Sequence, residues 1–228
     1  MGISENKPDL NDHSSPVNDL GLMGGMFDPV HFGHLNLAEN VLRQLSLDEL
    51  HFVPCGIPSH RGSLVAPSEH RLAMLELAIG DEKRFRVDDR ECLSSKTSYS
   101  FNTLAAVREE RPDCRLYFVM GLDAFNSLPS WYRWKEIFDL AHIIVAHRPE
   151  FKLEYTDELA DEYKTRTVST VEELRQQSLG NIYFAEIREM NVSSTIVRHH
   201  IAGHKPLESL LPAALIEYIE TKKLYTED

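Results

Sequence analysis

The sequence predicts an α/β fold, a doubly wound parallel sheet with helices on both faces. Six short apolar segments alternate along the chain with segments of helical periodicity, which is the order that successive βαβ units produce. Two of them, LYFVM at 116–120 and IIVA at 143–146, are apolar without alternation, as is typical of parallel strands covered on both faces. Sheets of this class bind ligands at the carboxyl ends of their strands, near the point where strand order reverses.

Strands are predicted where short apolar runs stand between turn residues, at 20–25, 51–54, 85–88, 116–120, 142–146 and 182–186.

Helices are predicted between these strands. Apolar residues recur at helical spacing over 35–45, and a second helix follows Ser68, a candidate N-cap. A third helix is predicted over 100–109. The last spans 213–223 and is opened by Pro212, whose missing N–H costs nothing at that position.

The domain organisation is expected to be simple. Residues 1–19 are polar without apolar periodicity and predict a flexible N-terminal extension, and residues 20–228 predict a single domain. Within it, 150–180 is expected to form an acidic helical insertion, because 150–175 carries eight acidic and four basic side chains.

Composition excludes several functional classes. Lys and Arg number 24 against 36 Asp and Glu, a net charge of −12, so the basic footprint of a nucleic-acid binder is missing. No stretch approaches ~20 apolar residues, and the start of the chain lacks the pattern of a secretory signal. Cys55, Cys92 and Cys114 are far apart and form no Cys-x-x-Cys pair, which fits free thiols in a reducing compartment. We expect a cytoplasmic protein without membrane or nucleic-acid partners, and the oligomeric state stays open.

The segment GGMFDPVHFGH, residues 24–34, follows the first predicted strand and leads into a helix. Glycines let a ligand approach the backbone, and the helix start offers unpaired N–H groups and a positive dipole end. His31 and His34 are three residues apart and face the same way there. The pattern predicts a phosphate site. The alternatives are a pair of packed surface histidines and a two-histidine metal site, which supplies two of the usual four zinc ligands.

A second phosphate-binding segment is predicted at 192–198, VSSTIVR. Ser193, Ser194 and Thr195 precede a short helix, and Arg198 lies one turn further on, able to grip phosphate with two N–H donors. The alternative is an ordinary helix cap with a surface arginine. The adjacent His199 and His200 splay apart on a helix and are expected at the surface.

The two segments resemble the H-x-G-H and S-S-T-x-x-R signatures of the nucleotidyltransferase superfamily related to class I aminoacyl-tRNA synthetases. Four more segments narrow the resemblance to bacterial nicotinate-mononucleotide adenylyltransferases: IPSHR at 57–61, TSYSFNTL at 97–104, GLDAFNSLPSWYRW at 121–134 and AHRP at 146–149. The resemblance covers the chain from about Leu20 to Tyr225. It implies a Rossmann-like nucleotidyltransferase fold.

The resemblance also implies a reaction. ATP and nicotinate mononucleotide would give nicotinate adenine dinucleotide and pyrophosphate by direct in-line attack on the α-phosphorus, with Mg²⁺ held mainly by the ATP phosphates and no metal ligand from the protein. The implied catalytic residues are His31, His34 and Arg198. The implied ATP-binding residues are Gly24, Gly25, Met26, Phe27, His34, Gly121, Asp123, Arg148, Ser193, Ser194, Thr195 and Arg198. The implied mononucleotide-binding residues are His60, Arg61, Ser100, Trp131 and Tyr132, with the nicotinate ring stacked on Trp131. Trp134 is expected in the core.

Two positions depart from the family pattern. Met26 stands where Thr or Ser is usual, and Ser59 replaces the second proline of a Pro-Pro-His element. Neither changes a histidine or Arg198, so activity is expected to survive. In spite of the net charge of −12, the substrate pocket is predicted to be positive. The cationic groups expected there are His31, His34, His60, Arg61, Arg148 and Arg198.

Three alternatives remain open. The acceptor of the same reaction could be nicotinamide mononucleotide, FMN or phosphopantetheine, although the aromatic pair Trp131–Tyr132 argues against the last, which has no flat ring to stack. The chain could be a catalytically silent nucleotide-binding regulator. A zinc-binding module is the third alternative.

Overall fold

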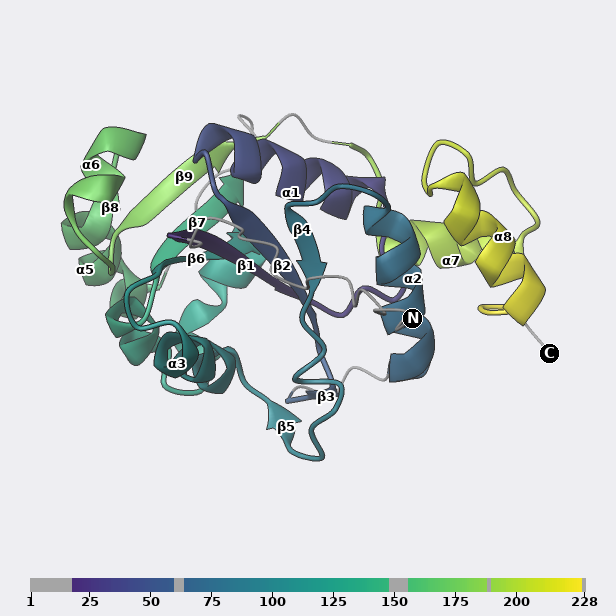
Figure 1. Ribbon diagram of the computed structural model, residues 1–228, viewed down its shortest axis with the longest axis horizontal. Helices are drawn as coiled ribbons and strands as arrows, with labels where there is room; N and C mark the ends of the chain where they lie inside the picture. Colours follow the sequence, from purple (N-terminus) through teal and green to yellow (C-terminus); the bar gives the residue numbers. More distant parts are fainter. Residues whose placement is uncertain (1–17, 60–63, 148–155, 188–189, 227–228) are drawn as a thin grey trace, which may run out of the picture.

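The computed structural model describes residues 18–59, 64–147, 156–187 and 190–226. Its main sheet has seven strands in the order β4-β2-β1-β6-β7-β9-β8, and every pairing is parallel (Figure 1). These strands are β1 (Asp19–Gly25), β2 (Glu49–Pro54), β4 (Phe85–Val87), β6 (Arg115–Gly121), β7 (His142–His147), β8 (Thr167–Val168) and β9 (Ile182–Glu186). A separate pair is formed by β3 (Ile57–Pro58) and β5 (Thr97–Ser98).

The helices connect these strands. They are α1 (Phe32–Gln44), α2 (Ser68–Ile79), α3 (Ser100–Glu110), α4 (Leu122–Asn126), α5 (Asp157–Arg166), α6 (Val171–Gln176), α7 (Ser194–Ala202) and α8 (Ala213–Lys222), with 3₁₀ helices η1 (Leu128–Ser130) and η2 (Trp134–Asp139).

Strand order reverses between β1 and β6. From β1 the chain builds outward through β2 to β4, and it then crosses to β6 and builds the other way through β7 and β9. The chain therefore leaves the carboxyl ends of β1 and β6 in opposite directions, toward α1 on one face of the sheet and α4 on the other. That divergence opens a crevice, the place where α/β sheets bind ligands.

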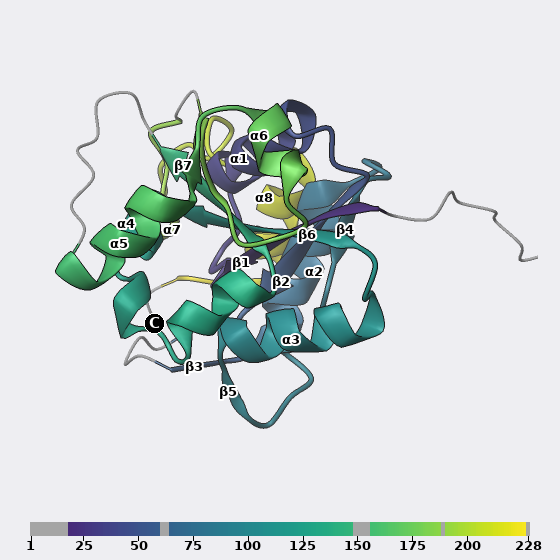
Figure 2. The same ribbon diagram turned by 90° about the vertical axis from the view of Figure 1, so that its left-hand side faces the viewer.

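Helices cover both faces of the sheet. Side chains of the central strands divide by alternation into two core clusters: Leu22 and Phe118 belong to one, and Met23 and Val119 to the other. The first cluster packs against α3, α4, α5 and both 3₁₀ helices, and the second against α1, α2, α6, α7 and α8. Figure 2 shows α1 and α3 on opposite sides of the sheet. The predicted fold class is confirmed.

The six predicted strands are present, with ends within two residues of the prediction. The helix predicted from residue 35 begins three residues earlier, at Phe32. The prediction that Ser68 caps α2 is wrong: Pro67 occupies the N-cap, and Ser68 is the first helical residue, where its hydroxyl accepts a hydrogen bond from Arg71. Trp134 lies in the core with 9% of its surface exposed, as expected.

The predicted acidic insertion is described from residue 156 onward. It contains α5, α6 and the strand β8, which pairs with β9 and forms one edge of the sheet. The predicted N-terminal extension lies outside the described residues up to residue 17, and β1 already begins at Asp19. Within the part of the chain that the structure describes, no helix has the length and apolar character needed to cross a membrane.

Candidate active site

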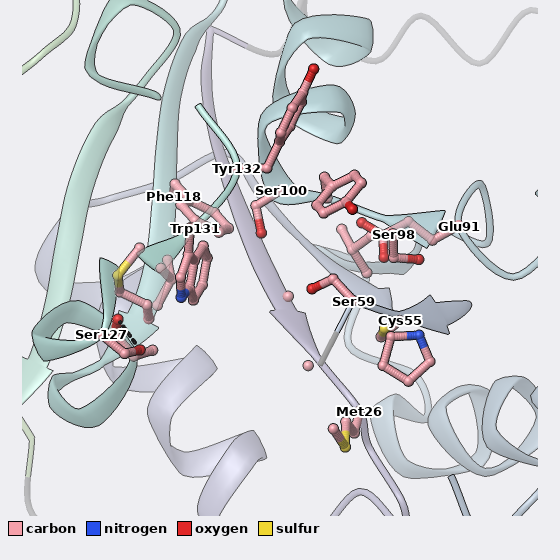
Figure 3. A pocket seen from close by; sticks show the side chains of 18 of the residues that line it. Met26, Cys55, Ser59, Glu91, Ser98, Ser100, Phe118, Ser127, Trp131 and Tyr132 are labelled. Atoms are coloured by element: carbon pink, nitrogen blue, oxygen red, sulfur yellow. Dashed lines mark hydrogen bonds between the residues drawn. The ribbon is translucent and has the colours of Figure 1, made fainter. Parts of the chain in front are cut away.

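A pocket of about 470 Å³ opens at the carboxyl ends of the central strands, at the reversal of strand order (Figure 3). Strand β1, the loop after it and the end of β6 form one part of its wall, and the start of α3 with the segment 127–132 forms another. Among the predicted site residues it brings together Gly24, Gly25, Met26, Ser100, Gly121, Trp131 and Tyr132. Met26 and Ser59, the two residues that depart from the family pattern, both line the pocket, and Met26 is 45% exposed.

One wall of this pocket is aromatic. The Trp131 ring meets Phe118 edge to face, with 6.3 Å between centroids, and it packs against the core cluster below. Tyr132 is exposed and lies 4.7 Å from the ring of Tyr99. Figure 3 shows Trp131 beside Phe118, across the pocket from Ser59. A flat ligand ring can stack on this wall.

Glu91 is a pocket residue that sequence reasoning missed. It is the one charged side chain among the described residues that line the pocket, and its Oε1 accepts a hydrogen bond from the Thr103 hydroxyl. The backbone around it packs tightly: a Cβ on Gly56 would lie 2.0 Å from the Glu91 carbonyl oxygen, so only glycine fits there. No motif flanks Glu91 in the sequence, and the close contact with Gly56 exists only in the fold.

His31 and His34 form a stacked pair at the start of α1. His31 is the N-cap, and the two rings lie 3.7 Å apart at 22°. The His31 backbone N–H donates to His34 Nδ1 at 3.3 Å, so neutral His34 carries its proton on Nε2. Phe27, itself buried, packs edge-on against His34 at 5.0 Å. The predicted orientation of the two histidines on one side of the helix start is found.

The histidine pair lines a second cavity of about 210 Å³, bounded across from it by the end of β7 and by Ile187, Met190 and Val192. Gly33 is required there, because a Cβ at this position would lie 2.9 Å from Val192 Cγ1 and 3.0 Å from His31 Nδ1. The glycine between the histidines lets the His31 ring and Val192 lie close to the helix start.

Burial controls the charge of this pair. It lowers the pKa of His31 to about 4 and the pKa of His34 well below its usual value. Both rings are therefore neutral at pH 7 in the empty protein, and they do not supply the positive charge that the sequence suggested. His31 Nδ1 is buried and has no hydrogen-bond partner among the described residues. A buried ring nitrogen without a partner is what an incoming ligand would satisfy.

The start of α7 meets the loop after β1. Ser193 caps the helix, its Oγ accepting from the Ile196 N–H at 3.2 Å, and the Ser194 hydroxyl donates to the Pro29 carbonyl at 2.9 Å. Arg198 Nη1 donates to the Asp28 carbonyl at 2.6 Å. The second predicted phosphate segment thus lies directly against the first.

Other predicted residues lie away from the large pocket or outside the described residues. Asp123 is exposed in the first turn of α4, two residues beyond Gly121, and does not line the large pocket. His60, Arg61 and Arg148 lie outside the described residues. His199 is exposed as expected, whereas His200 is half-buried, with Nδ1 2.8 Å from the Pro206 carbonyl oxygen.

The described part of the site offers few side chains that could hold a metal ion. Across residues 18–59, 64–147, 156–187 and 190–226, no group of three or more His, Cys, Asp and Glu side chains is placed to hold a metal ion. The carboxylate closest in sequence to the histidines, Asp28, already accepts three hydrogen bonds, from the N–H groups of Val65 and Ala66 and the hydroxyl of Tyr225. The donor set suits phosphate oxygens better than a resident divalent ion.

Comparison with known proteins identifies relatives along most of the chain. A family model described as cytidylyltransferase-like matches residues 22–200. The chain is 41% identical to "Probable nicotinate-nucleotide adenylyltransferase" of Methylococcus capsulatus, over 91% of this chain and 100% of that protein. A protein of the same name from Aeromonas salmonicida is 38% identical, over 92% of this chain and 98% of that protein.

A solved structure has the same fold. It is the Plasmodium falciparum nicotinic acid mononucleotide adenylyltransferase complexed with NaAD, which matches with a TM-score of 0.69 at 19% identity, over 91% of this chain and 97% of that one. The likeness supports the fold, and the closer sequence relatives support the family. The chain therefore belongs to the cytidylyltransferase-like family, among its nicotinate-nucleotide adenylyltransferases.

Proposed function

We propose that this protein transfers the adenylyl group of ATP to nicotinate mononucleotide, releasing pyrophosphate and forming nicotinate adenine dinucleotide in NAD biosynthesis. The observation that carries the proposal is the placement, around one loop after β1, of an aromatic-walled pocket and a stacked pair of histidines, of which His31 is buried and His34 half-buried. A ring-bearing substrate and a polyphosphate need these two surfaces side by side. The names of the relatives from Methylococcus capsulatus and Aeromonas salmonicida give the same activity.

The reaction needs positioning and charge stabilisation more than covalent chemistry. The phosphate of the mononucleotide attacks the α-phosphorus of ATP in line, and negative charge grows on the oxygens around that phosphorus. Neutral His34 presents its Nε2–H as a hydrogen-bond donor, because Nδ1 is already occupied by the His31 backbone N–H. His31 supplies the second ring, whose buried Nδ1 has no hydrogen-bond partner among the described residues. Preorganised donors of this kind stabilise the transition state without reorganising during the reaction.

The β- and γ-phosphates are assigned to the start of α7. The Ser194 hydroxyl donates its proton to the Pro29 carbonyl, whereas the Ser193 hydroxyl only accepts a hydrogen bond in the cap. The donors that remain for an anion are therefore the first-turn N–H groups of this helix and the Ser193 O–H. Arg198 lies one turn further and carries a permanent charge toward the leaving pyrophosphate.

The mononucleotide is assigned to the large pocket. The pyridine ring would stack on Trp131, and Ser100, the first residue of α3, offers a helix-terminal N–H to the ring carboxylate. A carboxylate gains more from that positive helix end than a neutral carboxamide does. This difference favours the acid over the amide as acceptor.

Mg²⁺ is assigned to the substrate. It would arrive on the ATP phosphates, where it neutralises charge and stabilises the leaving pyrophosphate. The chain's own residues then bind and orient the complex.

The three cysteines are free thiols, which is consistent with the predicted cytoplasmic location.

The test is pyrophosphate release from ATP and Mg²⁺ with nicotinate mononucleotide, compared in parallel with nicotinamide mononucleotide. We expect release with the acid and at least ~10-fold lower kcat/KM with the amide, the effect of losing one charge-assisted contact. A preference for the amide would contradict the assignment of the carboxylate to the start of α3. Release with neither would move the function to another acceptor or to a silent nucleotide binder.

A further inference from the structure

Tyr225, near the end of the described chain, contacts the loop that joins β1 to α1. Its hydroxyl donates to Asp28 Oδ1 at 2.7 Å, across 197 residues of sequence. The backbone after α8 is bent to allow this: Lys223 and Tyr225 have φ angles of 52° and 62°, left-handed values that are unfavourable for residues with a side chain. Such a conformation persists where surrounding contacts hold it.

Asp28 is buried, with 4% of its surface exposed, and its side chain joins three segments. Oδ2 accepts from the Val65 N–H at 2.6 Å, and Oδ1 accepts from the Ala66 N–H at 3.1 Å and from Tyr225. Burial beside this carboxylate raises the pKa of Tyr225, so the hydroxyl stays protonated and remains a donor. A buried carboxylate that loses a donor is destabilised, and its loop loses a fixed position.

The same stretch of backbone holds the start of α7. The Asp28 carbonyl accepts from Arg198 Nη1, and the next carbonyl, that of Pro29, accepts from the Ser194 hydroxyl. Any shift of Asp28 is therefore passed to Arg198 and, through the loop, to His31 two residues after Pro29.

Arg71 closes the arrangement from the other side. It is fully buried in α2 and donates to the carbonyls of Met26 at 2.9 Å and Ala66 at 3.3 Å. It thereby clamps the loop after β1 to the loop that ends at Ala66. The Tyr225–Asp28 hydrogen bond adds the C-terminal segment to these two loops.

We propose that Tyr225 is a positioning residue for the adenylyl transfer, which sets the placement of His31 and Arg198 by fixing Asp28. The proposal rests on the proposed function. In this proposal Tyr225 does not touch the substrate. Its role differs from simple stabilisation because Asp28, which it holds, lies in the first phosphate-binding segment and its carbonyl accepts from Arg198 of the second.

The test is Tyr225→Phe, which removes the hydroxyl and keeps the ring. We expect kcat to fall about 10- to 100-fold, since small displacements of catalytic groups cost this much, with little change in KM for nicotinate mononucleotide. The amides of Val65 and Ala66 should exchange with solvent faster, because their acceptor is less firmly held. This exchange is measured by NMR or mass spectrometry and does not depend on activity.

Tyr218→Phe is the matched control. Tyr218 also belongs to the C-terminal segment, and its hydroxyl lies 2.8 Å from His70 Nδ1 on α2, but it does not contact Asp28. We expect its kcat to equal that of the wild type, with thermal unfolding of both variants above the assay temperature.

The outcomes separate the two proposals. A wild-type protein that releases no pyrophosphate with either mononucleotide overturns the proposed function and this inference with it. An active wild type with kcat of Tyr225→Phe within ~2-fold of it, or an equal loss in Tyr218→Phe, overturns the inference alone.

Discussion

At the scale of single residues, the proposed function has the stacked histidines donate hydrogen bonds as neutral rings. Burial keeps both rings uncharged at pH 7, and the His31 backbone N–H fixes the proton of His34 on Nε2. A nearby negative charge raises the pKa of an imidazole, so a bound polyphosphate opposes the effect of burial. Because Nδ1 of His34 accepts from the His31 N–H, the proposed contribution of this ring is donation from Nε2 in its neutral form.

Replacing His34 tests this role directly. His34→Ala removes the Nε2–H donor, and we expect kcat to fall about 10²- to 10³-fold, the loss measured for preorganised donors at other transition states. Pyrophosphate release under saturating ATP measures it, and circular dichroism checks that the fold is intact. His199→Ala, at an exposed position next to Arg198, is the control and should keep wild-type turnover. Full activity of His34→Ala would leave this ring without a catalytic role.

The sequence predicts those residues whose signal is local. The spacing of His31 and His34 was sufficient to place both rings at the start of a helix. Glu91 and Tyr225 could not be predicted in the same way, because each acquires its role from a contact distant in sequence: Glu91 lines the pocket formed by β1 and β6, and Tyr225 reaches Asp28 across 197 residues. The neutral state of the histidines also depends on burial, which the motif does not encode.

At the scale of elements, the first turn of α7 holds an observed cap and a proposed anion site. The Ser193 hydroxyl caps the helix, and the N–H groups beside it are the proposed phosphate donors. An N-cap and an anion site compete for the same donors, so a substitution can separate them.

Ser193→Asp separates the two roles. Aspartate caps helices as well as serine does, so the thermal midpoint should be unchanged, whereas its negative charge should raise KM for ATP at least ~10-fold by repelling the phosphates. Ser193→Ala is the matched variant: it should cost about 1 kcal/mol of stability and change KM for ATP far less. Thermal unfolding and steady-state kinetics measure both. An unchanged KM in Ser193→Asp would remove the start of α7 from the ATP site.

Element prediction succeeded for strands of three residues or more and missed the two-residue strands β3, β5 and β8. The unbroken runs of β6 and β7 predicted buried parallel strands, and the structure has them at the centre of the sheet. Two-residue strands such as β8 carry no periodicity, and pairing with β9 alone defines that strand. The start of α2 was misplaced by one residue because Pro67, with ψ of 154°, takes the cap position without a side-chain donor or acceptor.

At the scale of the whole molecule, the parallel topology determined where the site had to be. The reversal of strand order between β1 and β6 was not readable from the sequence, but any doubly wound sheet has such a point, and the pocket lies there. The same burial that builds this sheet also holds histidines in their neutral form. His142, in β7, is fully buried, with Nδ1 accepting from the Asn181 N–H and with Nε2 unpartnered among the described residues.

These buried histidines make stability depend on pH. Burial lowers the pKa of both His31 and His142 from 6.5 to about 4. Between these two pKa values the unfolded chain binds protons that the folded chain does not. The contribution of these histidines to the free energy of unfolding is therefore fully present above pH 6.5 and decreases as pH falls toward 4. Each histidine should cost about 2 kcal/mol between pH 7 and pH 5. Urea unfolding at pH 7, 6 and 5 at constant ionic strength measures the slope.

His142→Phe isolates one of these contributions. The ring can still stack on Tyr117, 5.3 Å away, but it cannot be protonated. The variant loses the acceptor for the Asn181 N–H and should be less stable than the wild type at pH 7. Its dependence on pH should nevertheless be shallower by about 1 kcal/mol per pH unit, because one proton is no longer taken up on unfolding. Since each slope is measured within one protein, the loss at pH 7 does not affect the comparison. Parallel slopes would show that His142 titrates alike in the folded and unfolded states. The acid sensitivity would then come from the other histidines whose pKa is lowered, which are His31, His34 and His51.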